Sequence, residues 1–132
     1  MIDEKSTKAE VLEAINQDCD ALQFASEELK GDREFMLEVF GQNSLAFLHA
    51  SDKLKADRGF IMEAVKLDGY VALMYASAEL KADREVVVAA VNRNWDALHC
   101  ASKELQAEIR FTIAQLITGD MAKFKNKEIK ND

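Results

Sequence analysis

The chain of 132 residues contains no proline, only five glycines and only two cysteines. Proline disrupts the interior of helices and of strand ladders, so its absence is typical of a chain built from closely linked helices. The small number of glycines leaves little room for long loops. Hydrophobic residues make up 48% of the chain, which suffices for one domain with its own core and argues against disorder over most of its length.

Basic side chains are in the minority, 17 against 24 acidic ones, and the formal net charge is −7. An acidic field repels nucleic-acid phosphates and anionic membranes, so it disfavours both as partners, although a local basic patch can override it. The first ten residues lack the apolar run of a signal peptide. No stretch approaches the roughly 18 uninterrupted apolar residues of a membrane-spanning helix. We therefore expect neither a signal peptide nor a membrane span.

What the chain does contain is one sequence repeated four times, at residues 7–31, 32–56, 57–82 and 83–107. The clearest landmark of the repeat is an Ala-Ser pair, at positions 25–26, 50–51, 76–77 and 101–102. Self-similarity at a fixed short period indicates a repeat array. Cys19 and Cys100 lie three repeat lengths apart, which argues against a disulfide between them. Two unpaired cysteines are typical of the cytoplasm or another reducing compartment.

Each repeat predicts an αα-hairpin of two helices. The first helix is expected to begin after an N-cap side chain, at Thr7, Asp32, Asp57 or Asp83. Its apolar residues recur at i, i+3 and i+4, as at positions 36, 39 and 40, and turn residues follow it. The third repeat carries one extra residue around positions 68–71, which we expect a surface turn to absorb.

The Ala-Ser landmark is predicted to lie in the middle of a continuous second helix. Phe47, Ala50, Ser51 and Leu54 fall at i, i+3, i+4 and i+7, on one buried stripe. Two small side chains would let a neighbouring helix approach closely, and the hydroxyl would bond back to the carbonyl four residues earlier. On this interpretation, Ser51→Leu destabilises by overpacking, by about 1–3 kcal/mol.

Residues 108–132 are expected to cap the array. Positions 108, 111, 113 and 116 match the start of a fifth first helix, and the repeat pattern then ends. Met121 and Phe124 could pack a final helix. Four lysines make the end of the chain locally basic: Lys123, Lys125, Lys127 and Lys130.

The recurring pattern, DRE followed by three apolar residues, then AV, N, ALxxAS and ELKA, resembles a family of tandem short helical repeats. Members of that family occur in bacterial and protist proteins and have no assigned function. The resemblance covers roughly residues 7–116 and is best over residues 32–107. The first copy lacks Asp-Arg, and the third has Gly59 in place of glutamate. The resemblance implies an all-helical array and no activity.

Two sets of side chains are candidates for binding a partner. Phe24, His49, Tyr75 and Cys100 occupy one equivalent position, directly before Ala-Ser. Stacked repeats would align them into a ladder, which is either a peptide-binding groove or part of the packing between repeats. Alanine at both Phe24 and Tyr75 would separate the two, since only packing residues would unfold the chain. Tyr70 and Trp95, expected in turns, are either exposed anchors or fold back over their hairpins.

No constellation of residues predicts chemistry. The possible soft metal ligands are Cys19, His49, His99 and Cys100, and they lack the spacing of a metal site. Cys100 has no histidine at a catalytic spacing, and the serines lie on the predicted buried stripe. We therefore expect no cofactor, no metal and no enzymatic activity.

Two charged series recur with the repeat. Arg33, Arg58 and Arg84 could clamp phosphates or acidic peptides, but we favour pairing with carboxylates of neighbouring loops. Glu13, Glu38 and Glu63 are interpreted as a solvated face rather than a Ca²⁺ site, because no EF-hand loop accompanies them.

These observations predict an all-α domain of tandem αα-hairpin repeats, forming a short solenoid or a compact helical array. The expected function is a non-enzymatic protein–protein interaction or scaffold module with a protein or peptide partner. Its candidate contact residues are Phe24, His49, Tyr75, Tyr70 and Trp95. One alternative is a nucleic-acid-binding helical array, which would need a basic face. The other is a structural spacer from a larger protein.

Overall fold

The computed structural model describes the backbone of residues 2–131 and the side chains of residues 2–118. The secondary structure of the described residues is helical, without a strand, which confirms the predicted all-α class. The chain divides into two compact units, Met1–Ala101 and Ser102–Asp132. Most of the repeat array lies in the first unit, and no helix of the described residues is long and apolar enough to cross a membrane.

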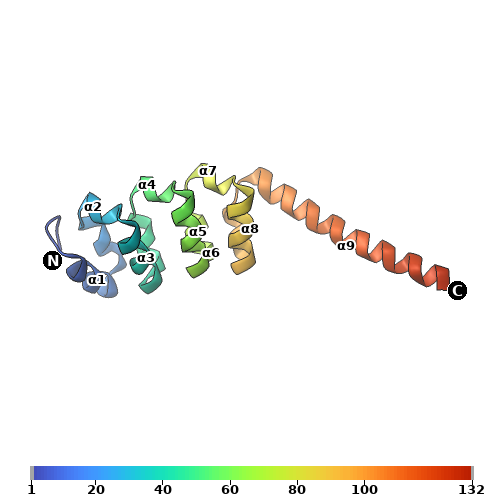
Figure 1. The fold of residues 1–132 in the computed structure, drawn as a ribbon, viewed down its shortest axis with the longest axis horizontal. Helices are drawn as coiled ribbons and strands as arrows, with labels where there is room; N and C mark the ends of the chain where they lie inside the picture. The colour runs from blue at the N-terminus through green and yellow to red at the C-terminus, as the bar shows by residue number, and fades with distance from the viewer. Residues whose placement is uncertain (1, 132) are drawn as a thin grey trace. The chain divides into compact units, whose positions relative to one another are not determined.

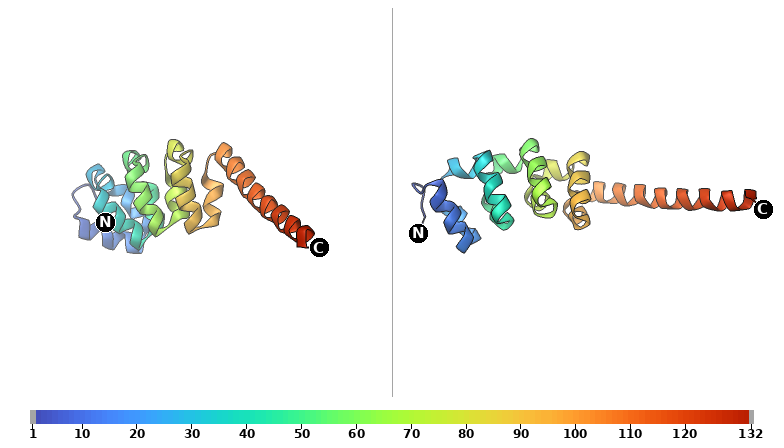
Figure 2. Two further views of the ribbon diagram at one scale, coloured as in Figure 1. Left: turned by 45° about the vertical axis from the view of Figure 1, so that its right-hand side comes forward. Right: turned by 60° about the horizontal axis from the view of Figure 1, so that its bottom comes forward.

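The first helix of every repeat has ten residues: α1 (Lys8–Gln17), α3 (Arg33–Gln42), α5 (Arg58–Leu67) and α8 (Arg84–Arg93). Each begins after its predicted N-cap, whose side chain accepts a hydrogen bond from a backbone N–H of the first turn. Such bonds satisfy donors that have no partner inside the helix. The four helices follow one another side by side along the first unit (Figure 1), and two further views show the same order (Figure 2).

The second helix of each repeat is not continuous, which corrects the prediction. In the second repeat the 3₁₀ helix η2 (Ser44–His49) ends, Ala50 and Ser51 are extended, and α4 (Asp52–Lys55) follows. The same break separates η1 (Cys19–Phe24) from α2 (Glu27–Lys30), α6 (Gly69–Tyr75) from α7 (Ala78–Lys81), and η3 (Trp95–Cys100) from α9 (Lys103–Asn131). The short helices α2, α4 and α7 lie along one edge of the first unit (Figure 1).

The serine of the landmark is an N-cap and does not bond back to a carbonyl four residues earlier. The hydroxyls of Ser26, Ser51 and Ser77 accept the backbone N–H of the leucine three residues on, at 3.1, 3.2 and 3.3 Å. An N-cap residue has extended backbone, so it starts a new helix and interrupts the old one. The overpacking expected for Ser51→Leu therefore loses its basis, because the half-buried Ser51 is a capping residue.

The break in the helix allows the backbone to join neighbouring repeats. The N–H of Ser51 donates to the carbonyl of Lys30 at 3.0 Å, and the N–H of Ser77 donates to that of Lys55 at 2.9 Å. Lys30 and Lys55 are the last residues of α2 and α4, where carbonyls lack a partner inside the helix. The extended landmark of one repeat thus satisfies the helix end of the repeat before it.

The extra residue of the third repeat is not absorbed by a turn. Asp68 is both the C-cap of α5 and the N-cap of α6, so there is no turn to lengthen. Instead, α6 is an α-helix of seven residues where the other repeats have a 3₁₀ helix of six. Tyr70 and Trp95 accordingly lie within helices, Tyr70 inside α6 and Trp95 at the start of η3.

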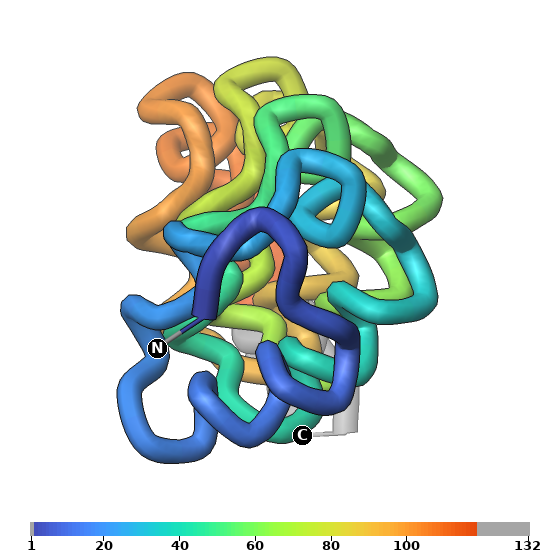
Figure 3. Tube along the Cα trace, turned by 90° about the vertical axis from the view of Figure 1, so that its left-hand side faces the viewer, coloured from blue at the N-terminus to red at the C-terminus, as the bar shows by residue number. Residues whose placement is uncertain are grey.

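The core of the first unit extends through the junctions between repeats. Phe47 is fully buried and contacts three other rings, Phe40 of its own repeat and Phe60 and Tyr75 of the next, at centroid distances of 5.2, 5.6 and 6.4 Å. The view from the N-terminal end shows the repeats one behind another, with the first in front (Figure 3). Each repeat therefore completes its core with its neighbours.

In the second unit a single helix, α9, runs from Lys103 to Asn131. Its first residues correspond to the short helices of the earlier repeats. The predicted boundary between array and cap, after residue 107, lies inside this helix, as does the predicted start of a fifth first helix at Glu108. The side chains of Met121 and Phe124 and of the four lysines lie outside the described residues.

Candidate functional site

The side chain before Ala-Ser lies towards the preceding repeat. His49 Nε2 lies 3.0 Å from Asp20 Oδ1, and Cys100 Sγ lies 3.9 Å from the carbonyl oxygen of Tyr70. Tyr75, as described above, contacts the ring of Phe47. In the second, third and fourth repeats, the ladder residues thus contribute to the packing between repeats.

The basic residues at the start of α1, α3 and α5 join neighbouring repeats as well. Arg33 Nη1 lies 2.6 Å from Asp57 Oδ2, and Arg58 Nε lies 2.8 Å from Asp83 Oδ2. The backbone N–H of Phe60 and the guanidinium of Arg33 lower the pKa of Asp57. These contacts favour the structural interpretation of the arginine series over a phosphate clamp.

We call the surface that a repeat presents to the repeat before it its leading face. In the fourth repeat this face includes the backbone of Ala90, which packs so closely on α6 that a Cβ on Gly69 would lie 2.7 Å from the Ala90 oxygen. Each leading face in the second to fourth repeats is covered in this way by the preceding repeat. The first repeat has the same face, and no repeat covers it within the described residues.

The exposed fractions of the side chains differ between the leading face of the first repeat and those of the later repeats. Ala14 and Ala21 are half-buried, and Phe24 is 45% exposed. The counterparts of the two alanines in the later repeats are fully buried: Val39, Ala64, Ala90, Ala46, Ala72 and Ala97 are all 0% exposed. Those of Phe24, namely His49, Tyr75 and Cys100, are half-buried. The first repeat therefore presents, as open surface, the apolar residues that elsewhere form a junction.

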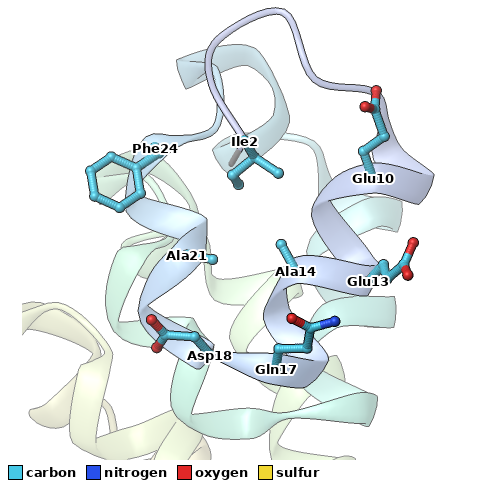
Figure 4. A pocket seen from close by; sticks show the side chains of 8 residues that line it. All are labelled: Ile2, Glu10, Glu13, Ala14, Gln17, Asp18, Ala21 and Phe24. Atoms are coloured by element: carbon cyan, nitrogen blue, oxygen red, sulfur yellow. The ribbon is translucent and has the colours of Figure 1, made fainter.

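A pocket of about 440 Å³ lies on this leading face (Figure 4). The helix α1 supplies Glu10, Glu13, Ala14 and Gln17, and the N-cap Asp18 precedes Ala21 and Phe24 of η1. Ile2, from the segment before α1, completes the lining. Figure 4 shows Ile2, Ala14 and Ala21 pointing into the space between α1 and η1.

The lining combines apolar side chains with three carboxylates and no basic group. Glu10 is fixed by a capping box, in which the backbone N–H of Thr7 donates to its Oε1 at 3.0 Å. Hydrogen bonds from Thr7 lower the pKa of Glu10, so this carboxylate is ionised at neutral pH. The pocket therefore has an apolar centre beside negative charge.

The five predicted contact residues do not gather in one site. Phe24 lines the pocket, whereas His49 and Tyr75 lie half-buried at junctions farther along the array. Tyr70 is half-buried in α6, and Trp95 is 55% exposed at the start of η3. Phe24 is the member of the ladder that no preceding repeat covers.

The sequence analysis missed the other residues of the pocket, Ile2, Glu10, Glu13, Ala14, Gln17, Asp18 and Ala21. A signal for them existed in the first repeat. Glu10 stands where the later repeats have Phe35, Phe60 and Val86, and all three of those residues are buried. A carboxylate at a position that is apolar and buried in the other three repeats indicates that the first repeat does not pack there as the later repeats do.

Asp18, Cys19 and Asp20 could together approach a metal ion, because their ligand atoms lie within 4.8 Å of one another. Existing contacts already use two of the three: Asp18 accepts the N–H of Asp20, and Asp20 pairs with His49. Cys100 is equally poor as a reactive group, because burial raises the pKa of its thiol and keeps it protonated.

The repeated units, their backbone junctions and the open end face define a short all-α array of tandem repeats. Residues 11–55 and 57–106 each match a protein family described as a domain of unknown function, DUF4116, and the chain belongs to that family. Each match spans about two of the four repeats. The family assignment agrees with the resemblance to tandem helical repeats of unknown function. No curated protein and no solved structure matches the chain.

Proposed function

We propose that the chain is a non-enzymatic protein-interaction module that binds its partner through the leading face of the first repeat. The pocket carries this proposal, because the half-buried Ile2, Ala14 and Ala21 and the exposed Phe24 line it. The equivalent surface of every later repeat is buried by protein. A surface of this composition is therefore suited to a protein contact.

The charge around the pocket favours a protein over a nucleic acid. Residues 1–101 carry 19 acidic and 11 basic side chains, and Glu10, Glu13 and Asp18 line the pocket itself. Nucleic-acid binding requires cations that neutralise phosphates. The partner suited to this face combines apolar side chains with lysine or arginine.

The ionisable groups support a role without catalysis. Among the side chains that the structure describes, the carboxylates with lowered pKa are Asp32, Asp57 and Asp83, which are N-caps, and Glu10, which belongs to a capping box. Their shifts arise from hydrogen bonds and ion pairs that hold the fold together. Catalytic sites instead gather perturbed groups in one pocket.

Ala21→Arg tests the proposal, because it places a long cation across the pocket. The matched control is Ala56→Arg, the same substitution at an exposed C-cap in the middle of the array. Proteins from the source cell should be captured by the wild-type chain and by Ala56→Arg, and be lost with Ala21→Arg. Circular dichroism verifies that both variants are folded. Equal capture by all three chains would show that the leading face of the first repeat is not the binding surface.

A further inference from the structure

We infer that the pocket of the first repeat binds helix α9 of a second copy of this chain, so that two copies exchange these helices. The inference rests on the proposed function, because it names the occupant of the same pocket. Three observations bear on it: exposed apolar side chains on α9, the use of the leading face in the inner repeats, and the charges of the two units.

Helix α9 carries an apolar stripe that ends in exposed side chains. Ile109, Ile113, Leu116 and Ile117 recur at i, i+4, i+7 and i+8, which is one face of a helix. Leu116 is 62% exposed and Ile117 57%, whereas Ile109 and Ile113 are half-buried. Phe111 is 63% exposed and lies off this face. Helices in proteins are stabilised mainly by packing of such a face, so this part of α9 is an apolar surface available to a partner.

The leading face is a surface that receives helices. In each later repeat it is covered by helices of the preceding repeat, as α5 contacts α3 and α8 contacts α5 and α6. The first repeat offers the same surface open, between α1 and η1 (Figure 4). An apolar stripe laid into a groove between helices is a recurring mode of recognition.

Charge favours α9 as the occupant and disfavours other contacts between copies. Residues 1–101 carry eight more acidic than basic side chains, whereas residues 102–132 carry six basic and five acidic ones. Two first units therefore repel each other, whereas the second unit of another copy, with a net charge of +1, is not repelled by a first unit.

The exchange we infer is mutual. Each copy has one pocket and one α9, so a pair related by a two-fold axis would fill both pockets, whereas a one-way contact would extend from copy to copy. The assembly that we expect is the mutual dimer, and its affinity falls as salt rises.

Analytical ultracentrifugation of the full chain over a range of protein and salt concentrations tests the inference. The wild-type chain should reach a dimer that dissociates as salt is raised. Ala21→Arg, in the pocket, and Leu116→Glu, on α9, should each weaken the dimer at least about tenfold, because each loses both contacts. The matched controls Ala56→Arg and Gln115→Glu, both at exposed positions, should dimerise like the wild type.

Mixing the two disabled variants gives the sharpest result. The Leu116→Glu copy keeps an intact pocket, and the Ala21→Arg copy keeps an intact helix. Their mixture should therefore form a one-to-one dimer held by a single contact, weaker than the wild type and stronger than either variant alone. No gain on mixing would overturn the exchange. If Ala21→Arg lowers the melting temperature, Phe24→Glu at the exposed rim replaces it.

The outcomes separate this inference from the proposed function. A wild-type chain that stays monomeric, including one that docks α9 on its own pocket, overturns the exchange between copies. If Ala21→Arg still abolishes capture of another protein in that case, the proposed function stands with a different occupant. If Ala21→Arg changes neither self-association nor capture, both are refuted.

Discussion

The second and third repeats differ by one residue between the same two landmarks, and that residue changes the type of helix. In the second repeat, Asn43 caps the N–H two residues on, and its carbonyl accepts from Ala46, three residues on. In the third, Asp68 caps the N–H three residues on, and its carbonyl accepts from Ala72, four residues on. Both hydrogen bonds that the N-cap residue accepts therefore come from one residue farther along the chain in the third repeat than in the second.

The two helices nevertheless span almost the same distance. Six residues of 3₁₀ helix, at about 2.0 Å per residue, span about 12 Å, and seven residues of α-helix, at about 1.5 Å, span about 10.5 Å. The extra residue is taken up by tighter rise along the axis, so the N-cap and the Ala-Ser pair keep their places. The comparison shows that the repeats share the N-cap and the Ala-Ser pair, whereas the helix between these two points can be either 3₁₀ or α.

The first residue of the α-helical form is a glycine, where a larger side chain would meet α8. Gly69 is buried against α8, and an added Cβ would meet the backbone oxygen of Ala90. The corresponding first residues of the 3₁₀ helices are Cys19, Ser44 and Trp95. The third repeat thus approaches its neighbour by backbone contact, whereas the second relies on the rings around Phe47.

The largest expected effect follows from removing that ring. Phe47→Ala should lower the free energy of unfolding by about 3–5 kcal/mol, through lost burial and a cavity between two repeats. Its counterpart Leu73→Ala, equally buried, should cost at least about 1 kcal/mol less, because fewer carbons are removed. Urea denaturation measures both. Equal losses would mean that the aromatic contacts add nothing specific to the second repeat.

Gly69→Ala is expected to be next, with a loss of about 1–3 kcal/mol from overpacking against the backbone of α8. Gly41→Ala is the matched control, because a Cβ on Gly41 would meet nothing within 4 Å. That control should stabilise the chain by up to about 1 kcal/mol through higher helix propensity. Thermal unfolding should give the two substitutions opposite signs, and a neutral Gly69→Ala would contradict the close approach.

The break at Ala-Ser should matter equally in both repeats. Ser51→Ala and Ser77→Ala each remove an N-cap, with an expected loss of about 1 kcal/mol. Ser51→Asp should retain most of the stability, since aspartate also caps. Chemical denaturation of the three variants tests this. A neutral effect of alanine, or a difference above about 1 kcal/mol between the two repeats, would show that the capping bond does not hold the break.

The smallest effect concerns pH at the starts of the two repeats. Hydrogen bonds lower the pKa of Asp32 and Asp57 in the folded chain. Their stabilisation is therefore present above the unfolded-state pKa, near 4, and is lost as the pH falls through the folded-state pKa. Asp57→Asn keeps a capping side chain, so it should cost less than about 1 kcal/mol at pH 7.

The comparison sharpens this prediction. Asp57 pairs with Arg33 at 2.6 Å, whereas Asp32 pairs with Lys8 at 3.1 Å. Asp57→Asn should therefore cost more than Asp32→Asn near neutral pH, and both differences from the wild type should vanish by about pH 2. Stability curves between pH 7 and pH 2 measure them. A stability difference between the Asn variants and the wild type that grows as the pH falls would contradict the prediction.

The first helices could be predicted almost to the residue, because their start signals are local. An aspartate caps the helix within three residues of its own position, as Asp32 does for Phe35, so no knowledge of distant contacts is needed. The break at Ala-Ser could not be separated from a continuous helix by periodicity. Phe47, Ala50 and Leu54 are buried in both arrangements. The acidic residues after the serines, Glu27 and Asp52, were the overlooked signal of a helix start.

The candidate site was less predictable than the fold, because it depends on which faces of the repeats are covered among the described residues. Phe24 and Tyr75 are equivalent in sequence, yet Phe24 lines an open pocket and Tyr75 contacts Phe47. Only the order of the repeats distinguishes them. Trp95 in the fourth repeat is exposed, whereas Tyr70 in the third is half-buried.

The hydrogen bonds from Ser51 to Lys30 and from Ser77 to Lys55 are made by main-chain atoms alone. A joint of that kind does not depend on which side chains flank it. Repeats could therefore be duplicated, deleted or exchanged by recombination while this connection stays intact, and only the buried side chains at the new joint would need to adapt. The Ala-Ser break therefore joins consecutive repeats by the same main-chain bond, whichever side chains the two repeats carry.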